Sequence, residues 1–274
     1  MSGTCELRAL AKLTLSLRVV GVRGDGYHLL DAEMVNVDLA DTLEFGPGDG
    51  LEVVDDGASL GGHGPVPADG TNLVARALQL VGRHAKVRLV KRVPAGAGLG
   101  GGSADAAAVL RWASLGDANP CGSTGKGGSP GGGASSPLPA GLALELASRL
   151  GSDVPFCLAG GGRARVQGAG EQLLPLPFDE VEGRSYTLLV PPFGVSTADV
   201  YAAWDELRSK RRGWDGPNDL EPAALRVEPR LAEWRDRLGD ATGEQPVLAG
   251  SGSTWWVPGI WPGDGRIVVG TARP

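Results

Sequence analysis

The segment PAGAGLGGGSADAA, which runs from Pro94 to Ala107, constrains the fold of this chain more than any other stretch. Five glycines occupy the seven positions from Gly96 to Gly102, and alanine-rich sequence that favours a helix follows at once. Glycine loses more conformational entropy on folding than any other residue, so an ordered run of glycines indicates close approach of the backbone to another group. A helix that starts directly after such a run presents unpaired N–H groups and the positive end of its dipole, which together bind anions. The segment therefore predicts a strand, a glycine loop and a helix in that order, with a phosphate site near Ser103.

Two other interpretations of the glycine run follow from the local pattern. Gly96, Gly98 and Gly101 satisfy the spacing of a dinucleotide-binding motif, but that fold needs a second strand ending in an acidic residue directly after the helix. Here a segment rich in Gly, Ser and Pro, residues 116–137, follows instead. The remaining alternative is a glycine-rich turn that binds no ligand.

Residues 116–137 form a low-complexity segment that carries too few apolar side chains to fold by itself. Within it, TGKGG resembles part of a P-loop, but Gly127 stands where Ser or Thr should follow Lys126, and Pro120 stands where the first glycine belongs. We therefore expect a flexible surface insertion here rather than a nucleotide site.

The rest of the chain alternates between strand and helix patterns. Residues 13–19 alternate apolar and polar side chains, which is typical of a half-buried strand. Residues 71–85 show helical spacing behind a candidate cap at Thr71 or Asn72. Further strand patterns cover residues 32–45, 86–94, 161–168, 185–192 and 265–272, a helix pattern covers 138–151, and a polar, glycine-rich turn region extends to about residue 70.

Charge and cysteine content exclude several classes of protein. The net charge of −6 over 274 residues, with a pI near 5.2, argues against a protein that binds duplex nucleic acid. Three cysteines without metal-ligand spacing indicate a reducing compartment and no disulfide framework. Without an apolar run of membrane-spanning length or a signal-peptide pattern, we expect a cytoplasmic protein that acts on a small molecule and contacts neither nucleic acid nor membrane.

Four segments, taken together, resemble one family of enzymes. PAGAGLGGGSADAA is similar to the phosphate-binding signature of the GHMP small-molecule kinases, the superfamily of galactokinase, homoserine kinase and mevalonate kinase. Three more segments resemble signatures of the GHMP kinases that act on 4-diphosphocytidyl-2-C-methyl-D-erythritol. These are residues 11–41 with the element GDGYH, residues 151–171 with SDVPF, and residues 247–257 with GSGS. The four segments stand in the same order as in that family and span nearly the whole chain.

The resemblance implies a fold and a reaction. The fold would be α/β (α+β), with a ribosomal-S5-like N-terminal domain over residues 1–162 and a ferredoxin-like C-terminal domain over residues 163–274. The reaction would be ATP-dependent phosphorylation of the 2-hydroxyl of the cytidine-diphosphate sugar alcohol, with Mg²⁺ carried by the nucleotide; the motifs assign no residue as a metal ligand. Two alternatives stay open: another GHMP kinase of the homoserine or mevalonate type, or a non-catalytic nucleotide-binding protein of this fold. We expect a monomer or a weak homodimer.

The resemblance also implies the catalytic residues. Asp153 matches the family's catalytic aspartate, and a carboxylate there can accept the proton of the substrate hydroxyl. Lys12 matches the catalytic lysine, and its ammonium group can offset charge on the transferred phosphoryl group. The alternative for Asp153 is an Asx turn or a helix cap before Val154 and Pro155, and a lone lysine at the start of a strand is usually solvated.

The binding residues follow from the same motifs. Those implied for the ATP phosphates are Pro94, Ala95, Gly96, Ala97, Gly98, Leu99, Gly100, Gly101, Gly102, Ser103 and Ala104. Those implied for the substrate side are Thr14, Tyr27, His28, Tyr201, Gly250 and Ser251. Among these, Tyr201 falls where an aromatic ring stacks on cytosine. Thr14 departs from the family, which commonly has asparagine at this position.

Overall fold

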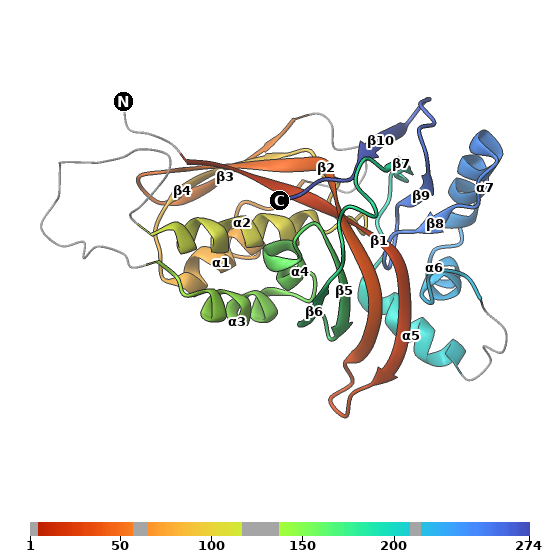
Figure 1. Ribbon diagram of the computed structural model, residues 1–274, viewed down its shortest axis with the longest axis horizontal. Coiled ribbons are helices and arrows are strands. Elements are labelled where there is room, and N and C mark those ends of the chain that lie inside the picture. Colours follow the sequence, from red (N-terminus) through yellow and green to blue (C-terminus); the bar gives the residue numbers. More distant parts are fainter. Residues whose placement is uncertain (1–4, 57–64, 117–136, 209–214) are drawn as a thin grey trace, which may run out of the picture.

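The computed structural model describes residues 5–56, 65–116, 137–208 and 215–274 (Figure 1). The strands are β1 (Cys5–Val22), β2 (His28–Gly46), β3 (Gly50–Asp55), β4 (Lys86–Lys91), β5 (Arg163–Gly168), β6 (Gln172–Pro175), β7 (Ser185–Leu189), β8 (Val247–Leu248), β9 (Trp255–Pro258) and β10 (Arg266–Gly270). The helices are α1 (Leu73–Val81), α2 (Gly101–Leu115), α3 (Ala140–Leu150), α4 (Val154–Ala159), α5 (Thr197–Leu207), α6 (Glu221–Val227) and α7 (Leu231–Thr242). Nearly all of the predicted insertion, residues 117–136, lies outside the described residues.

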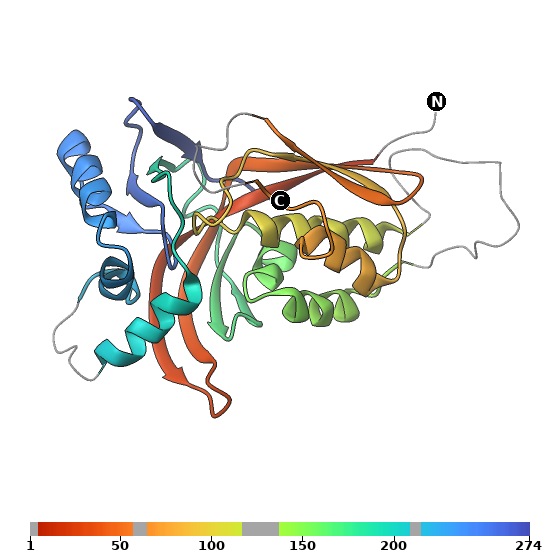
Figure 2. The same ribbon diagram turned by 180° about the vertical axis from the view of Figure 1, so that it is seen from behind.

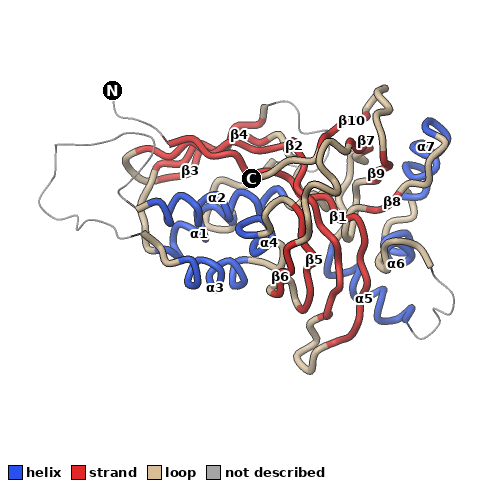
Figure 3. The backbone as a smooth tube through the Cα atoms, viewed as in Figure 1, coloured by secondary structure: helices blue, strands red, loops and turns tan. Residues whose placement is uncertain are grey.

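The strands form two sheets, each covered by its own helices. The first sheet has the order β3-β4-β2-β5-β6, with β1 paired to β2, and the second has the order β10-β7-β9-β8. Helices α1 to α4 pack under the first sheet, α5 lies along the β1–β2 hairpin, and α6 and α7 lie beside the second sheet, as two opposite views show (Figures 1 and 2). The tube view draws strands in red and helices in blue, so the layer of helices under the first sheet can be followed there (Figure 3). None of the helices in the described ranges has the length and apolar character needed to cross a membrane.

Strands β1 and β2 form a long antiparallel hairpin that passes through both halves of the molecule. The register shifts just before Lys12 and again just after Thr14. Such irregularities change where side chains point along a strand. The apolar side chains of β1 accordingly enter two different cores, with Leu13 in the one that contains Leu99 and Leu17 in the one that contains Met34.

Most predicted elements are confirmed. The strand patterns at 13–19 and 32–45 lie within β1 and β2, and the helix after the predicted cap is α1. Asn72 rather than Thr71 caps it, because the Asn72 side chain accepts a hydrogen bond from the N–H of Val74 at 2.8 Å. The helix after the glycine run begins at Gly101, two residues before Ser103.

One prediction is wrong. The region up to residue 70 was expected to be turns, but residues 50–55 form β3, which pairs in parallel with β4. Six residues between glycine-rich stretches carry a weak pattern, and the hydrogen bonds that complete this strand come from a partner more than 30 residues later.

The second half of the chain also contacts β1 directly. The N–H of Leu17 donates to the carbonyl of Pro217, and the N–H of Asp219 donates to the carbonyl of Leu17, each at 2.9 Å. The segment around Asn218 therefore lies along β1 like a short extra strand. Strands on both sides of residue 162 belong to the first sheet, and where one domain gives way to the other stays a prediction.

Candidate active site

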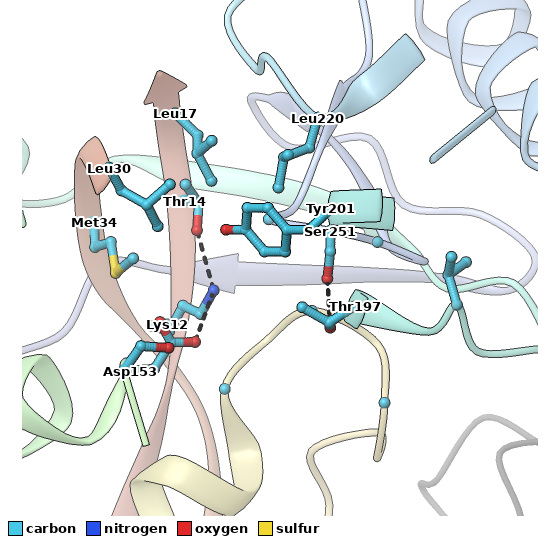
Figure 4. A pocket seen from close by; sticks show the side chains of 17 residues that line it. Lys12, Thr14, Leu17, Leu30, Met34, Asp153, Thr197, Tyr201, Leu220 and Ser251 are labelled. Carbon is cyan, nitrogen blue, oxygen red and sulfur yellow. Dashed lines mark hydrogen bonds and ion pairs between the residues drawn. The ribbon is translucent and has the colours of Figure 1, made fainter. Parts of the chain in front are cut away.

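A cavity of about 250 Å³ lies where β1, β2, the glycine loop and the second half of the chain meet (Figure 4). We call residues 94–100 the glycine loop and residues 249–252 the glycine turn. The lining residues are Lys12, Thr14, Leu17, Leu30, Met34, Gly96, Gly98, Gly100, Ser152, Asp153, Val195, Thr197, Tyr201, Leu220, Gly250, Ser251 and Gly252. Residues far apart in the sequence therefore line one space.

Lys12 and Asp153 form an ion pair at this cavity. The Lys12 Nζ lies 3.3 Å from Asp153 Oδ2 and donates to the Thr14 hydroxyl oxygen at 3.1 Å. Lys12 and Thr14 lie two residues apart on β1, so their side chains share one face of the strand. The lysine side chain is only 4% exposed, whereas that of Asp153 is 28% exposed. The ammonium group is thus held in place, and the carboxylate remains accessible from the cavity.

The side chain of Asp153 does not cap the helix that follows it. Asp153 occupies the N-cap position of α4, but its carboxylate makes no capping hydrogen bond. It points instead toward Lys12, as Figure 4 shows. The helix-cap interpretation therefore leaves this carboxylate unexplained, while an interaction with Lys12 accounts for it.

The glycine loop packs so tightly that Gly98 and Gly100 have no room for a side chain. A Cβ on Gly98 would lie 2.2 Å from the carbonyl oxygen of Ala249, and a Cβ on Gly100 would lie 2.7 Å from Cγ of Lys12. Both glycines have positive φ angles, +78° and +70°, which other residues rarely adopt. The N–H of Lys12 also donates to the carbonyl of Leu99 at 2.9 Å. The loop is thereby held against β1, and α2 starts where it ends.

The other predicted residues of the phosphate segment are distributed around this loop. Gly96, Gly98 and Gly100 line the cavity. Gly102 is exposed and Ser103 is partly exposed in the first turn of α2. Buried or partly buried supporting positions are Pro94, Ala95, Ala97, Leu99, Gly101 and Ala104. The structure thus brings three glycines of the segment to the cavity and places the rest behind or beside it.

The glycine turn packs directly against the glycine loop, and both segments line the cavity. Its carbonyl at Gly250 accepts from the side chain of Asn218 at 2.7 Å, and the same amide group donates to the carbonyl of Leu248 at 2.9 Å. The hydroxyls of Ser251 and Thr197 lie 2.8 Å apart. The sequence analysis selected Gly250 and Ser251 but missed Asn218 and Thr197, because no local motif marks either of them.

A second cavity of about 530 Å³ adjoins the first and shares Leu30, Ser152, Thr197 and Tyr201 with it. Tyr27 and His28 line only this second cavity. Burial, reinforced by the negative charge of Asp153, raises the pKa of the Tyr201 hydroxyl, so at neutral pH it stays a hydrogen-bond donor.

Tyr27, His28 and Tyr201 are the aromatic side chains that line the second cavity. The rings of His28 and Tyr201 have centroids 4.6 Å apart at an angle of 31°, and the His28 ring meets Trp204 edge-on at 5.5 Å. The His28 Nε2 lies 3.1 Å from Asp205 Oδ2. Tyr27 is 55% exposed at the edge of the cavity. The structure therefore brings Tyr201 and His28 into contact and leaves Tyr27 at the rim.

The chemistry of the first cavity is that of a phosphoryl-transfer site. The N-terminus of α2, which begins where the glycine loop ends, has backbone N–H groups that suit an anion. A carboxylate with a neighbouring ammonium group can handle a proton and a developing charge. In the described part of the chain, no group of three or more His, Cys, Asp or Glu side chains is arranged to hold a metal ion.

Comparison with known proteins identifies the class. The family model described as the GHMP kinases N terminal domain matches residues 72–119. A crystal structure of 4-(cytidine 5'-diphospho)-2C-methyl-D-erythritol kinase superposes with a TM-score of 0.63 at 32% identity, covering 92% of this chain and 88% of the other. The fold is that of the GHMP kinases, and the predicted α/β fold class is confirmed.

Curated relatives identify the family within this class. The chain is 38% identical to the 4-diphosphocytidyl-2-C-methyl-D-erythritol kinase of Pelotomaculum thermopropionicum, covering 90% of this chain and 86% of the relative. It is 34% identical to the enzyme of the same name from Ruegeria pomeroyi, covering 98% and 92%. The chain belongs to the 4-diphosphocytidyl-2-C-methyl-D-erythritol kinase family and is a small-molecule kinase.

Proposed function

We propose that this chain transfers the γ-phosphoryl group of ATP to the 2-hydroxyl of 4-diphosphocytidyl-2-C-methyl-D-erythritol, a step of the non-mevalonate route to isoprenoid precursors. The observation that carries the proposal is the Lys12–Asp153 pair, which opens onto a cavity lined by two glycine segments. The family to which the chain belongs supports the choice of substrate. A cytoplasmic location, a monomeric or weakly dimeric state and the lack of nucleic-acid binding stay predictions.

The glycine loop and the first turn of α2 are the proposed binding site for the ATP phosphates. A Cβ has no room at Gly98 or Gly100, and the free N–H groups at the start of α2 suit a phosphate. When bound, ATP supplies the phosphoryl group. We propose that Mg²⁺ arrives with the nucleotide and that its ligands come largely from phosphate oxygens, as is usual for this ion.

Asp153 and Lys12 are the proposed catalytic residues. The Asp153 carboxylate would accept the proton of the substrate hydroxyl and orient its oxygen toward the phosphorus atom. The Lys12 ammonium group would offset negative charge on the transferred group, because Thr14 and Asp153 hold it at the cavity wall. Thr14 therefore acts here as a hydrogen-bond acceptor that orients the lysine.

The second cavity is the proposed site for the cytidine end of the substrate. Tyr201 presents a ring that can stack on a base, and His28 and Tyr27 offer polar groups at the same cavity. Because this cavity adjoins the first, one elongated substrate can reach both. Recognition of the base would then position the distant hydroxyl at Asp153.

An ADP-release assay coupled to NADH oxidation tests the proposal. The purified chain with Mg–ATP should release ADP in the presence of the cytidine-diphosphate substrate, and ³¹P NMR should show a new phosphate monoester. Methylerythritol without its cytidine diphosphate, homoserine and mevalonate are the controls, and each should give background rates. Turnover of homoserine or mevalonate would favour another GHMP activity, and ATP binding with no turnover of any acceptor would favour a binding protein.

A further inference from the structure

A second buried lysine lies directly behind the glycine loop. Lys91, the last residue of β4, is 4% exposed. Its ammonium group forms ion pairs with Asp105 of α2, at 2.8 Å, and with Asp41 of β2. Both carboxylates are buried as well. We call these three residues the Lys91 cluster; none of them lines either cavity described above.

The cluster joins the chain segment that enters the glycine loop to the segment that leaves it. On the entry side, Asp41 Oδ1 accepts hydrogen bonds from the N–H groups of Arg92 at 2.6 Å and Val93 at 2.8 Å. On the exit side, Lys91 holds Asp105, which lies one turn inside α2. The loop is therefore fastened to the sheet at both of its ends.

Gly101 shows how closely the cluster approaches the first turn of α2. A Cβ at this position would lie 2.9 Å from Cγ1 of Val93 and 3.2 Å from Nζ of Lys91. The φ angle of Gly101 is not positive, so the backbone itself does not require glycine there. The requirement comes from Val93 and from the Lys91 ammonium group, which both lie directly behind the helix terminus.

When all three groups of the Lys91 cluster are ionised, one positive and two negative charges leave it with a net negative charge. Burial alone would lower the pKa of Lys91, but the negative charges of Asp105 and Asp41 have a larger, opposite effect. The pKa is therefore raised, and the lysine is an ammonium ion. Burial, opposed by Lys91 and reinforced by Asp41, raises the pKa of Asp105 to about 7. Asp105 also acts on the thiol of Cys157 in α4, whose pKa burial raises to about 12, so this thiol stays neutral.

We infer that Lys91, Asp41 and Asp105 are positioning residues that hold the glycine loop in its nucleotide-binding shape, and that the charge on Asp105 adjusts the affinity for the nucleotide. The inference rests on the proposed function, because it takes ATP phosphates as the ligand of the loop. A carboxylate that ionises behind a phosphate site repels the ligand. Affinity for ATP should therefore fall as pH rises through neutrality.

Calorimetric titration with Mg–AMP-PNP, a non-hydrolysable ATP analogue, tests the inference without turnover. Asp105→Ala removes one fastening point and should weaken binding about tenfold at pH 7, since small displacements of binding groups have effects of this size. Asp105→Asn keeps a hydrogen-bond acceptor for Lys91 and should stay within about threefold of wild type at pH 6. Its affinity should then lack the decrease that wild type shows between pH 6 and pH 8.

Arg88→Gln is the matched control. Arg88 pairs with Glu44 across the same two strands, β4 and β2, at 2.9 Å, but on their exposed side. It should bind the analogue as wild type does at every pH. Titration of the analogue's own phosphates is common to all variants and cancels in the comparison.

Two results would overturn the inference: wild-type affinity in folded Asp105→Ala, or an Asp105→Asn variant that keeps the wild-type dependence on pH. If Asp105→Ala does not fold, Gly101→Ala displaces Lys91 without removing a charge and should still weaken binding severalfold. In steady state, the KM for ATP should rise while the KM for the acceptor stays constant, which a general loss of stability would not produce. A chain that binds the analogue as described but phosphorylates no acceptor would contradict the proposed function and leave this inference standing.

Discussion

Lys12 and Lys91 share the same chemistry but occupy different surroundings. Each lies on a strand of the first sheet, each is 4% exposed, and each pairs with aspartate. The partner of Lys12, Asp153, is 28% exposed and lines a cavity. The partners of Lys91, Asp41 and Asp105, are sealed from solvent. An ion pair that opens onto a cavity can contact a substrate, whereas a sealed cluster can act only through the backbone it holds and through its charge.

Two consecutive glycines connect these regions. Gly100 lies against the side chain of Lys12, and Gly101 lies against that of Lys91. The end of the glycine loop is thus positioned by one lysine on the cavity side and by the other on the core side. The comparison teaches that removing a charge should damage turnover in the first region and stability or loop shape in the second.

The largest expected effect concerns the Lys12–Asp153 pair, which opens onto the first cavity. Asp153→Asn and Lys12→Ala should each lower kcat by about 10²- to 10⁴-fold, the range for loss of a general base or of electrostatic stabilisation. For Asp153→Asn, the melting temperature and the affinity for ATP should change little, because Asp153 is partly solvated. Steady-state kinetics with parallel thermal melts measure both quantities. Near-normal turnover in either variant would remove that residue from the mechanism.

Lys91→Met should give the opposite pattern. Removal of the ammonium group leaves two buried carboxylates facing each other, which we expect to lower the free energy of unfolding by about 3–5 kcal/mol. Urea denaturation measures this loss. Arg88→Gln, which breaks an exposed pair on the same strands, should lower it by about 0–1 kcal/mol. Equal stability of Lys91→Met and Arg88→Gln would show that a buried ion pair on these strands matters no more for stability than an exposed one.

Tyr201, which lines both cavities, allows the same region to be tested without removing a charge. Tyr201→Ala should raise the KM for the cytidine substrate by the equivalent of about 1–3 kcal/mol, which is typical for loss of one stacked base. The KM for ATP should be unaffected. Tyr201→Phe keeps the ring and should behave almost as wild type in the same assay. A variant that loses ATP affinity and keeps substrate affinity would exclude the assignment of the second cavity.

Single methyl groups on consecutive glycines sharpen the comparison. Gly100→Ala strains a positive φ angle and displaces Lys12, so kcat should fall by about tenfold. Gly101→Ala displaces Val93 and Lys91, so the KM for ATP should rise while kcat changes less. Gly141 of α3 is exposed, has no positive φ angle, and would have no atom within 4 Å of an added Cβ, which makes Gly141→Ala the control. Identical kinetics for the first two variants would argue against separate roles.

A separate prediction concerns the pH dependence of stability. The folded-state pKa of Asp105 is raised to about 7, above the value of an unfolded chain, so its contribution to stability is complete below about pH 4 and is lost as pH rises toward 7. Asp105→Asn should remove this loss. Because a pKa of about 7 already includes the ion pair with Lys91, we expect wild type to lose roughly 3 kcal/mol more stability than Asp105→Asn between pH 4.5 and pH 7.5. Urea denaturation at pH 4.5, 6 and 7.5 measures it, and parallel curves would contradict the expectation.

Local sequence was sufficient for most elements and for the type of chemistry. The alternation in residues 13–19, the cap at Asn72 and the glycine loop before α2 each depend on neighbouring residues, which is why their patterns predict them correctly. The resemblance to GHMP kinases rests on motifs of the same local kind. It led to Lys12 and Asp153, whose proximity the structure then shows.

The tertiary structure decided which of these residues work together. The Asn218 side chain donates to the carbonyls of Leu248 and Gly250, which lie 30 and 32 residues further along the chain. Asp205 contacts His28, which lies 177 residues before it. No local pattern indicates such partners, because a side chain's hydrogen bonds depend on which elements pack around it. The same holds for Lys12 and Lys91, both of which stand in ordinary strand patterns. Sequence determined that each is a lysine on a strand, and only the packing of α2, α4 and the second half of the chain decided which one faces a cavity and which one is sealed.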